Sequence, residues 1–401
     1  MNIEGWDIAL LGEICSITIG GTPSRANPIY WDVDKSTGNV WVSIRDLNQR
    51  VITDTAEYIT KEGIKNSNVK RLLAGTVILS FKLTIGRVAI AGKDLYTNEA
   101  IAGLCNSNIL PSFLYYGLQQ WDLLQGVDQA IKGATLNKQK LNKIQFNYPT
   151  SIKEQEQIAE VLSTIDRALT QTEAIIAKQQ RIKTGLMQDL LTKGIDENGN
   201  IRSEATHEFK DSAIGRIPVE WEVKIIGKIA SLQRGHDITE VEFIAGEYPV
   251  ISSSGIIGFH NISTSNSPNV VVGRKGSIGN VYYLDVDFWA HDTSLYVTNF
   301  FGNNEKYIYY LFSYLELERF GTKSGSPSLN RNDIHPLRIS LPKPSEQKLI
   351  SKRLTHFDNS ISNLKSNLNK LQHQKNGLMQ DLLTGKIRVT NLLKEKEPAS
   401  P

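Results

Sequence analysis

Cysteine is scarce in this chain. Only Cys15 and Cys105 occur among 401 residues, and they form neither a CxxC pair nor a zinc-ligand spacing. We therefore expect two free thiols in a reducing compartment such as the cytoplasm, without a disulfide framework.

The motifs of several large enzyme classes are also missing. The sequence contains no GxxxxGK[ST] phosphate loop, no HExxH, no GxSxG elbow and no G-x-G-x-x-G dinucleotide loop. These absences predict a non-catalytic protein that holds no cofactor and no metal.

Two short segments resemble functional motifs only in part. Asn27-Pro28-Ile29-Tyr30 lacks the second proline of the base-binding motif of amino-methyltransferases, so we interpret it as a turn before Trp31. Residues 196–200 resemble a calcium loop, but the glycine stands at position 4 instead of position 6, which argues against calcium.

Long apolar runs are absent as well. No segment approaches the roughly 20 apolar residues of a membrane span, and no basic segment followed by an apolar stretch opens the chain, so we expect neither a membrane segment nor a signal peptide. The net charge is only +3, and residues 345–401 carry ten basic and five acidic side chains. Contact with nucleic acid would therefore depend on local basic patches.

The chain does contain a repeat. Gly185–Thr192 (Gly-Leu-Met-Gln-Asp-Leu-Leu-Thr) recurs without change as Gly377–Thr384, at an offset of 192 residues. Glu154-Gln155 and Glu346-Gln347 follow the same offset, while Ile85-Gly86 and Ile278-Gly279 are 193 residues apart. A tandem of two similar halves can fold with an internal two-fold axis, which suits a two-part target such as duplex DNA.

Each half ends in a segment with helical periodicity. Residues 154–192 carry apolar side chains in steps of four and three, the spacing of a coiled coil, and the second half repeats this register. Ser151 and Glu154 form an expected capping box, and Gly194 and Gly385 are expected helix stops. We expect the two helices to pack antiparallel, with polar seam positions fixing their register: Thr172, Gln179, Lys183 and Lys375.

The stretches before the helices indicate mixed α/β domains, in which short β-branched runs alternate with one aromatic helical segment, Phe113–Leu124 or Lys306–Phe320. The predicted fold is α+β, with two similar mixed α/β domains joined by two long helices that form an antiparallel coiled coil with internal pseudo-two-fold symmetry. Its parts are a first domain (1–150), a helix with connector (151–205), a second domain (206–344), and a helix with a disordered tail (345–401, the tail from 394).

Turns that combine cations with small hydroxyl residues are the candidate contact sites. Arginine and lysine bind phosphates or guanine, and serine and threonine bind phosphates or base edges. The candidate DNA-binding residues are Thr22, Ser24, Arg25, Ser43, Arg45, Lys82 and Arg87 in the first half, and Ser253, Ser254, Arg274, Lys275 and Ser277 in the second.

These features together resemble the specificity subunit of type I restriction–modification systems over essentially the whole chain. The motifs that carry the resemblance are the Gly-Gly-Thr-Pro-Ser loop, the repeated Ile-Gly and Leu-Asn pairs, Glu-Gln, and the repeated octapeptide. The second helix departs from the pattern at its opening, Pro344-Ser345-Glu346-Gln347-Lys348. It lacks the capping-box glutamate, because lysine stands three residues after the serine.

The resemblance implies a specific division of labour. Each domain would recognise one half of a split double-stranded DNA site, and the helices would serve as spacer and docking surface for two methyltransferase subunits. Those subunits would supply the cofactor and methylation, and restriction subunits would supply ATP-driven cleavage. The expected seam and docking residues are Ile158, Leu162, Ile165, Leu169, Leu186, Leu190, Ile350, Leu354, Leu378 and Leu382.

Two alternatives remain at this point. A stand-alone DNA-binding regulator with duplicated domains would need no methyltransferase partner, and co-purification would separate it from a specificity subunit. A fused restriction–modification enzyme would need a methyltransferase domain, for which we find neither motifs nor room.

Overall fold

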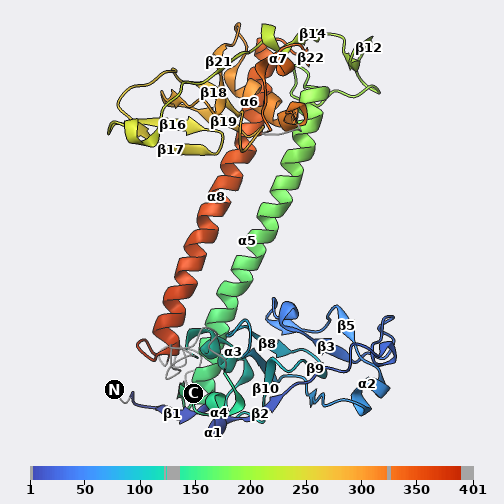
Figure 1. Ribbon diagram of the computed structural model, residues 1–401, viewed down its shortest axis with the longest axis vertical. Helices are drawn as coiled ribbons and strands as arrows, with labels where there is room; N and C mark the ends of the chain where they lie inside the picture. The colour runs from blue at the N-terminus through green and yellow to red at the C-terminus, as the bar shows by residue number, and fades with distance from the viewer. Residues whose placement is uncertain (1–2, 122, 124–135, 323–326, 390–401) are drawn as a thin grey trace, which may run out of the picture. The chain divides into compact units, whose positions relative to one another are not determined.

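The computed structural model describes residues 3–121, 123, 136–322 and 327–389, and they form two compact units (Figure 1). Unit 1 comprises Met1–Thr172 and Asn367–Pro401, and unit 2 comprises Glu173–Ser366. Both long helices are therefore divided between the units. The end of the expected aromatic helix, at residues 122 and 124, and the expected tail from 394 lie outside the described residues.

Unit 1 contains a five-stranded sheet of order β2-β10-β7-β8-β4, a four-stranded sheet of order β5-β3-β9-β6, and the pair β1-β11. The strands are β1 (Trp6–Leu10), β2 (Ser16–Ile19), β3 (Val40–Val42), β4 (Val51–Ile52), β5 (Glu57–Tyr58), β6 (Arg71–Leu72), β7 (Val77–Ser80), β8 (Val88–Ala91), β9 (Leu95–Thr97), β10 (Ile101–Cys105) and β11 (Gln145–Pro149). The short helices are α1 (Leu11–Ile14), η1 (Pro28–Tyr30), η2 (Ile44–Asp46), α2 (Lys61–Lys65), α3 (Pro111–Gln120) and α4 (Lys138–Asn142).

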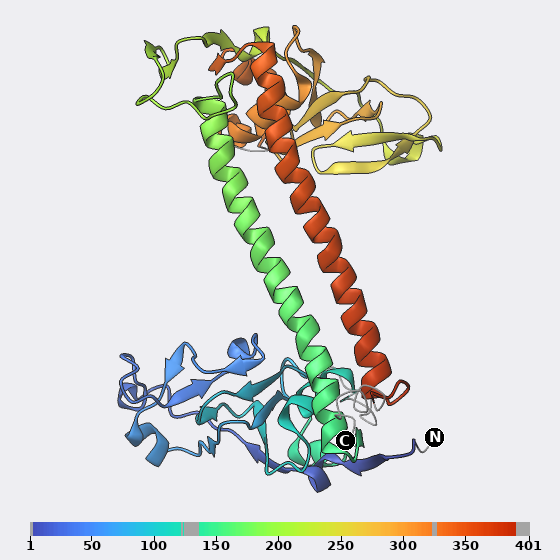
Figure 2. The same cartoon turned by 180° about the vertical axis from the view of Figure 1, so that it is seen from behind.

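Unit 2 repeats this plan with a four-stranded sheet of order β15-β21-β18-β19, a three-stranded sheet of order β17-β16-β20, and the pairs β14-β22 and β12-β13. The strands are β12 (Phe209–Ser212), β13 (Gly215–Pro218), β14 (Glu222–Ile225), β15 (Ser231–Arg234), β16 (Tyr248–Ser252), β17 (Gly255–His260), β18 (Asn269–Gly273), β19 (Val281–Leu284), β20 (Trp289–Ala290), β21 (Ser294–Asn299) and β22 (Arg338–Leu341). The short helices are η3 (Ile226–Lys228), η4 (Glu240–Glu242), α6 (Glu305–Tyr314), η5 (Leu317–Phe320) and α7 (Arg331–Ile334). In both views, β16 and β17 lie on the side of unit 2 away from β12 and β13 (Figures 1 and 2).

The apolar runs at residues 10–19 and 223–232 predict extended chain, but each is interrupted by a helical turn. In the first run, α1 separates β1 from β2; in the second, η3 separates β14 from β15. The reason is the burial of apolar side chains three residues apart, Leu11 with Ile14 and Ile226 with Ile229. A helical turn places such residues on one face, which a strand would not do.

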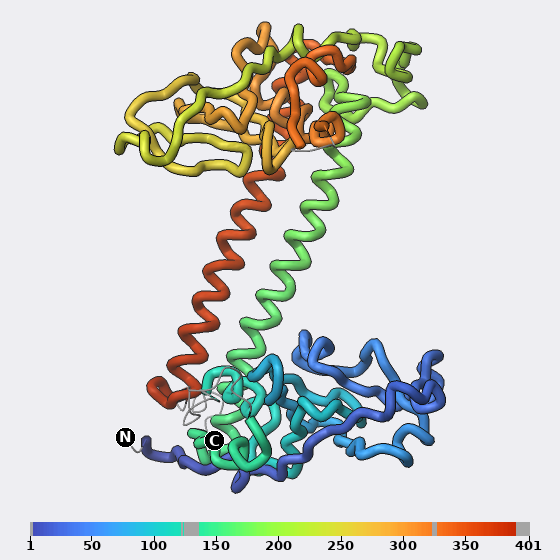
Figure 3. The backbone as a smooth tube through the Cα atoms, in the orientation of Figure 1, coloured from blue at the N-terminus to red at the C-terminus, as the bar shows by residue number. Residues whose placement is uncertain are grey.

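The long helices are α5 (Ile152–Thr192) and α8 (Pro344–Leu383). The backbone runs from β11 directly into α5 and from β22 directly into α8 (Figure 3). Gly194 and Gly385, which follow the helices, have φ values of 68° and 72°. This left-handed conformation suits glycine and ends a helix, so the expected stops are confirmed.

Each unit's core takes side chains from the start of one long helix and the end of the other. In unit 1, Ile158 and Leu162 of α5 join Leu382 and Leu383 of α8 against α3 and the sheet. In unit 2, Leu190 and Leu191 of α5 join Ile350 and Leu354 of α8. The helices are therefore antiparallel within each unit, and neither unit is complete without both.

The glutamate that opens each helix has a role that the capping-box prediction missed. Glu154 N–H lies 3.4 Å from Ser151 Oγ, but its carboxylate accepts hydrogen bonds from Arg388 Nε and Nη2, at 2.6 and 2.7 Å, beyond the end of α8. Glu346, the repeat of Glu154, accepts from Arg202 beyond the end of α5. A buried carboxylate needs such a partner, and this need outweighs a local cap.

The neighbouring glutamines attach each long helix to the mixed α/β domain that precedes it in the chain. Gln155 donates to Pro149 O and accepts from Leu110 N–H, which precedes α3, at 2.9 and 2.8 Å. Gln347 donates to Pro342 O and accepts from Asn304 N–H, which precedes α6, at 2.9 Å each. The Glu-Gln pair is therefore repeated because both units need the same junction.

Two lysines predicted at polar seam positions form ion pairs between the long helices. Lys375 Nζ lies 2.7 Å from Asp166, whose other oxygen accepts from the hydroxyl of Tyr116 in α3 at 2.8 Å. In unit 2, Lys183 pairs with Asp358, which also accepts from Tyr310 of α6 at 2.6 Å. Thr172, by contrast, donates to Ala168 O of its own helix at 2.8 Å.

Replacing Glu346 with alanine should destabilise unit 2 by about 3–5 kcal/mol, because it leaves the buried charge of Arg202 with only the half-exposed Glu220, 3.7 Å away, as a partner. The side chain of Arg202 is 8% exposed and that of Glu346 is 12% exposed. Urea unfolding followed by circular dichroism measures the change. Glu204→Ala is the matched control, because its pair with Arg216 is exposed and should contribute only about 0–1 kcal/mol. Equal effects of the two variants would contradict this account.

Candidate nucleic-acid interface

The first loop of each recognition domain depends on a glycine at the end of the first strand of the larger sheet. Gly20 N–H donates to Ile101 O at 3.2 Å, and Gly235 N–H donates to Ser294 O at 3.1 Å. A Cβ on Gly20 would come within 2.2 Å of Thr97 O, and one on Gly235 within 2.2 Å of His291 O. Close backbone approach therefore requires glycine at both positions.

The two hairpin tips also have the same backbone. Gly86 N–H donates to Ser80 O between β7 and β8, and Gly279 N–H donates to Gly273 O between β18 and β19, at 2.9 Å in both cases. This equivalence aligns Lys82 with Lys275, both of which were predicted as DNA-binding residues.

In unit 1, predicted residues gather around two carboxylates. Arg25 and Arg45 both bind Glu57, and the Arg25 guanidinium lies 3.7 Å from the centre of the Trp31 ring. The hydrogen bond from Arg25 lowers the pKa of Glu57. Thr22 donates to Glu99. Exposed ion pairs of this kind contribute little to stability, so a phosphate could compete for the two arginines.

The remaining predicted residues of unit 1 differ in how far their side chains are free to contact DNA. Arg87 is exposed at the hairpin and donates to Ile44 O at 3.3 Å, which connects the hairpin to the loop after β3. Ser43 Oγ bonds to Asp46 at 2.7 Å and caps η2, so its hydroxyl serves the loop itself. Ser24 is exposed, and its carbonyl oxygen accepts from the Trp31 indole at 3.2 Å.

In unit 2, the serine loop after β16 lies against the hairpin of β18 and β19. Ser253 is buried, with 6% exposed, and its carbonyl oxygen accepts from the hydroxyl of Tyr282 at 2.9 Å. Ser254 is exposed and bonds to Ser252. Lys275 is also exposed, whereas Ser277 is only partly exposed. Ser253 therefore shapes the loop, and its neighbours form the surface.

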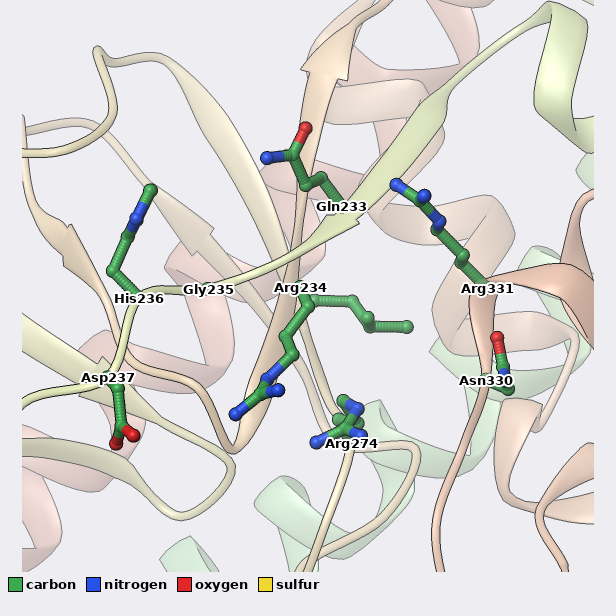
Figure 4. A pocket seen from close by; sticks show the side chains of 9 residues that line it. Gln233, Arg234, Gly235, His236, Asp237, Arg274, Asn330 and Arg331 are labelled. Carbon is green, nitrogen blue, oxygen red and sulfur yellow. The ribbon is translucent and has the colours of Figure 1, made fainter.

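An open cleft of about 740 Å³ in unit 2 collects three arginines from three segments (Figure 4). Arg234 is the last residue of β15, Arg274 follows β18 at the hairpin tip, and Arg331 begins α7. Arg234 lies 2.8 Å from Asp292, and Arg274 donates to Asp292 O at 3.3 Å. Arg331 forms no ion pair among the described residues, and it lines the cleft together with the acidic Asp237. The cleft is lined by Gln233, Arg234, Gly235, His236, Asp237, Arg274, Leu295, Asn330 and Arg331.

Sequence reasoning identified only Arg274 among these three arginines. A signal for Arg331 existed, because it follows the repeated Leu-Asn pair at Leu329-Asn330. The structure shows why that pair recurs: Leu329 is buried, and Asn330 caps α7 as Asn137 caps α4. The signal for Arg234 was its position directly before Gly235, which begins the first loop of unit 2 as Gly20 does in unit 1.

Residues 27–30 form a turn, as interpreted, and residues 196–200 form a turn as well. Asn27 Oδ1 accepts from Ile29 N–H at 3.2 Å and caps η1. Asp196 accepts from the backbone N–H groups of Asn198 and Asn200, and the bonds from Asn200 lower its pKa. Within the described ranges, no group of three or more histidine, cysteine, aspartate or glutamate side chains is placed to hold a metal, and no helix has the length and apolarity to cross a membrane.

The sequence matches a known protein family over most of its length. The family model "Type I restriction modification DNA specificity domain" matches residues 3–182 and 218–373. The chain belongs to this family, and its role is that of a DNA specificity subunit.

Relatives of similar length agree with this assignment. A putative type I restriction enzyme MjaX specificity subunit of Methanocaldococcus jannaschii is 26% identical, with 96% of this chain and 94% of that protein covered. The EcoprrI specificity subunit of Escherichia coli is 21% identical, covering 88% of each. The crystal structure of a type I S subunit from M. genitalium has the same fold, with a TM-score of 0.62 at 16% identity over 95% of this chain and 97% of that one.

The predicted seam and docking residues lie within the units themselves. Ile158, Leu162, Ile165, Leu169, Leu190, Ile350, Leu354 and Leu382 are at most 8% exposed, while Leu186 and Leu378 are partly buried against the cores. The buried side chains serve the chain's own packing, which is consistent with the seam prediction, and docking of a partner stays a prediction.

The free energy of unfolding of unit 2 should depend on pH through His335, which accepts a hydrogen bond from the backbone of β15. Leu232 N–H donates to His335 Nε2 at 2.9 Å, and burial lowers the pKa of His335 from its ordinary 6.5, with the charge of Arg331 adding to the effect. The unfolded chain therefore takes up a proton first as pH falls below 6.5. The stability supplied by neutral His335 is complete above that pH and is lost toward the lower folded-state pKa, at up to about 1.4 kcal/mol per pH unit.

His335→Gln should reduce this loss between about pH 7 and about pH 5, where histidine titrates. Unfolding free energies at both pH values measure the effect, and His373→Gln, at an exposed position of α8, is the control. An unchanged pH slope in His335→Gln would contradict the assignment.

Proposed function

We propose that the chain recognises a bipartite double-stranded DNA site, with unit 1 recognising one half and unit 2 the other. The observation that carries this proposal is the repetition of the loop frame with different side chains. The glycine after the first strand and the hairpin turn recur with equivalent hydrogen bonds. The frame presents Arg25 and Arg45 around Glu57 in unit 1, but a cleft with three arginines in unit 2. A constant frame with variable side chains suits the recognition of two different half-sites.

The names of the relatives support a place in a restriction–modification complex. The relatives match this chain over nearly their full lengths, and they are named type I restriction enzyme specificity subunits. These names do not favour a stand-alone regulator. In our proposal the chain supplies DNA recognition and no catalysis. Two methyltransferase subunits modify the DNA, restriction subunits cleave it, and the complex works in the cytoplasm.

The exposed part of the repeated octapeptide is the proposed methyltransferase docking face. Leu190 and Leu191 are core residues, but Gly185 and Gln188 are exposed, as are their repeats Gly377 and Gln380. Packing within the chain explains why the leucines recur and does not explain the glycine. A Cβ on either glycine would meet nothing within 4 Å, although glycine inside a helix costs about 1 kcal/mol relative to alanine. Two identical partners that approach the helices closely would require this face twice.

Gln188→Arg and Gln380→Arg test the docking face. Each single variant should bind one methyltransferase copy fewer, and the double variant should bind none, because a bulky charge blocks close approach. Native mass spectrometry counts the bound copies. Gln180→Arg, exposed on α5 and about 140° around the helix from the glycine, is the control. Full assembly of the double variant would contradict the assignment.

Exchange of residues 1–150 for those of a relative tests the division of the site. One half of the methylated motif should change and the other should stay, because each unit carries its own loops. Sequencing the methylated positions in host DNA gives the result. The reciprocal exchange of residues 206–344 is the control and should alter only the opposite half. A change in both halves from one exchange would refute independent recognition.

Arg331→Ala and Arg274→Ala distinguish two kinds of DNA contact in the cleft. If the arginine binds phosphate, affinity should fall for all sequences, and the slope of log affinity against log salt should decrease by about 1. If it binds a base, one position of the half-site should lose discrimination by about 1–3 kcal/mol. Fluorescence anisotropy at several salt concentrations measures both. Arg319→Ala, an exposed residue in a local pair with Glu316, is the control. Cleft variants that match this control would remove the cleft from the interface.

A further inference from the structure

The hairpin tip of unit 1 contains a leucine in an unusual position. Leu83 has a φ of 63°, in the left-handed region, and it is 91% exposed. Both properties are unfavourable for leucine, because its Cβ crowds the backbone in this conformation and its side chain gains nothing from exposure to water. Backbone strain of this kind is a reason to look for a function.

Unit 2 shows what the turn itself requires. The equivalent residue is Gly276, with a φ of 74°, and the hydrogen bonds that close the two turns are the same. The turn therefore accepts glycine without change of backbone. Nothing in the folding of the hairpin explains the leucine.

The surroundings of Leu83 point to DNA. Lys82 precedes it, and the exposed Arg87 follows the turn, so cations stand on both sides of the apolar side chain. The tip also adjoins the loop after β3, because Arg87 donates to Ile44 O. A two-stranded β-ribbon fits the major groove, where thymine presents an apolar methyl group. Lysine and arginine beside it would bind the phosphates at the groove edges.

We propose that Leu83 is a specificity-determining residue of unit 1, which contacts the 5-methyl group of a thymine in the major groove of its half-site. This inference rests on the proposed function of unit 1 as a half-site recognition domain. Gly276 presents no side chain, so unit 2 lacks the equivalent contact and must recognise its half-site by other residues.

The test uses the full chain in complex with its methyltransferase, and duplexes in which each thymine of the unit 1 half-site is replaced in turn by uracil. For the wild type, one replacement should weaken binding about fourfold, the effect of burying one methyl group. Leu83→Gly should bind the thymine duplex about fourfold more weakly and should show no further loss with uracil. Leu83→Asn, which tolerates the left-handed conformation but is polar, should behave like Leu83→Gly and so separates loss of contact from gain of flexibility.

Leu83→Gly relieves the backbone strain, so its melting temperature should equal or exceed that of the wild type, and weaker binding will not reflect unfolding. Leu73→Ala is the matched control, since Leu73 is 62% exposed near the opposite end of β7 and should leave both affinities unchanged. If Leu83→Gly keeps the wild-type sensitivity to uracil, or if no thymine shows coupling to Leu83, the inference is wrong. A wild-type complex without any sequence preference would instead refute the proposed function.

Discussion

A buried ion pair joins the start of each long helix to the segment that follows the other helix. Glu154, 1% exposed, is bound by Arg388, and Glu346 is bound by Arg202. Removing these charges from water is costly, so each carboxylate needs an arginine that arrives from a distant part of the chain. The antiparallel arrangement of the helices within each unit satisfies this need, and the two cores follow from it.

This arrangement ties the recognition domains to the helices at two levels. Near the helix start, Gln155 and Gln347 hold the backbone that precedes α3 and α6. Further along, Asp166 and Asp358 each bind a tyrosine from those helices and a lysine from the opposite long helix. Burial raises the pKa of Tyr116 and Tyr310, with the aspartate adding to the shift, so both hydroxyls stay protonated and able to donate. The two units therefore share the same junction with the long helices, although their loops differ in sequence.

Much of this support could be predicted from the sequence, because it depends on local signals. The heptad spacing identified both long helices, Gly194 and Gly385 marked their ends, and the Ile-Gly repeat located equivalent hairpin turns. The polar seam lysines were also visible, since they interrupt an apolar pattern. The helix periodicity, the terminal glycines and the turn glycines act within a few residues of their own positions, whereas the partners of the seam lysines, Asp166 and Asp358, became known only from the fold.

What could not be predicted depends on partners that are distant in sequence. Glu154 matched a local capping box, and only the fold shows that Arg388 takes its carboxylate. The octapeptide suggested a docking surface, but Leu190 and Leu382 are buried in the cores. Arg234 and Arg331 meet Arg274 in one cleft only because β15, α7 and the hairpin converge. The sequence around Leu83 gives no sign of its left-handed φ or of its exposure, which are properties of the folded hairpin.

The most direct test of the account is the pattern of methylated bases in the genome of the host. Two recognition units in one chain predict an interrupted motif, with two short specified half-sites separated by an unspecified gap of constant length. Long-read sequencing that detects modified bases, in the host and in a strain without this gene, would show it. A continuous motif that depends on the gene, or a gap that varies from site to site, would contradict the account.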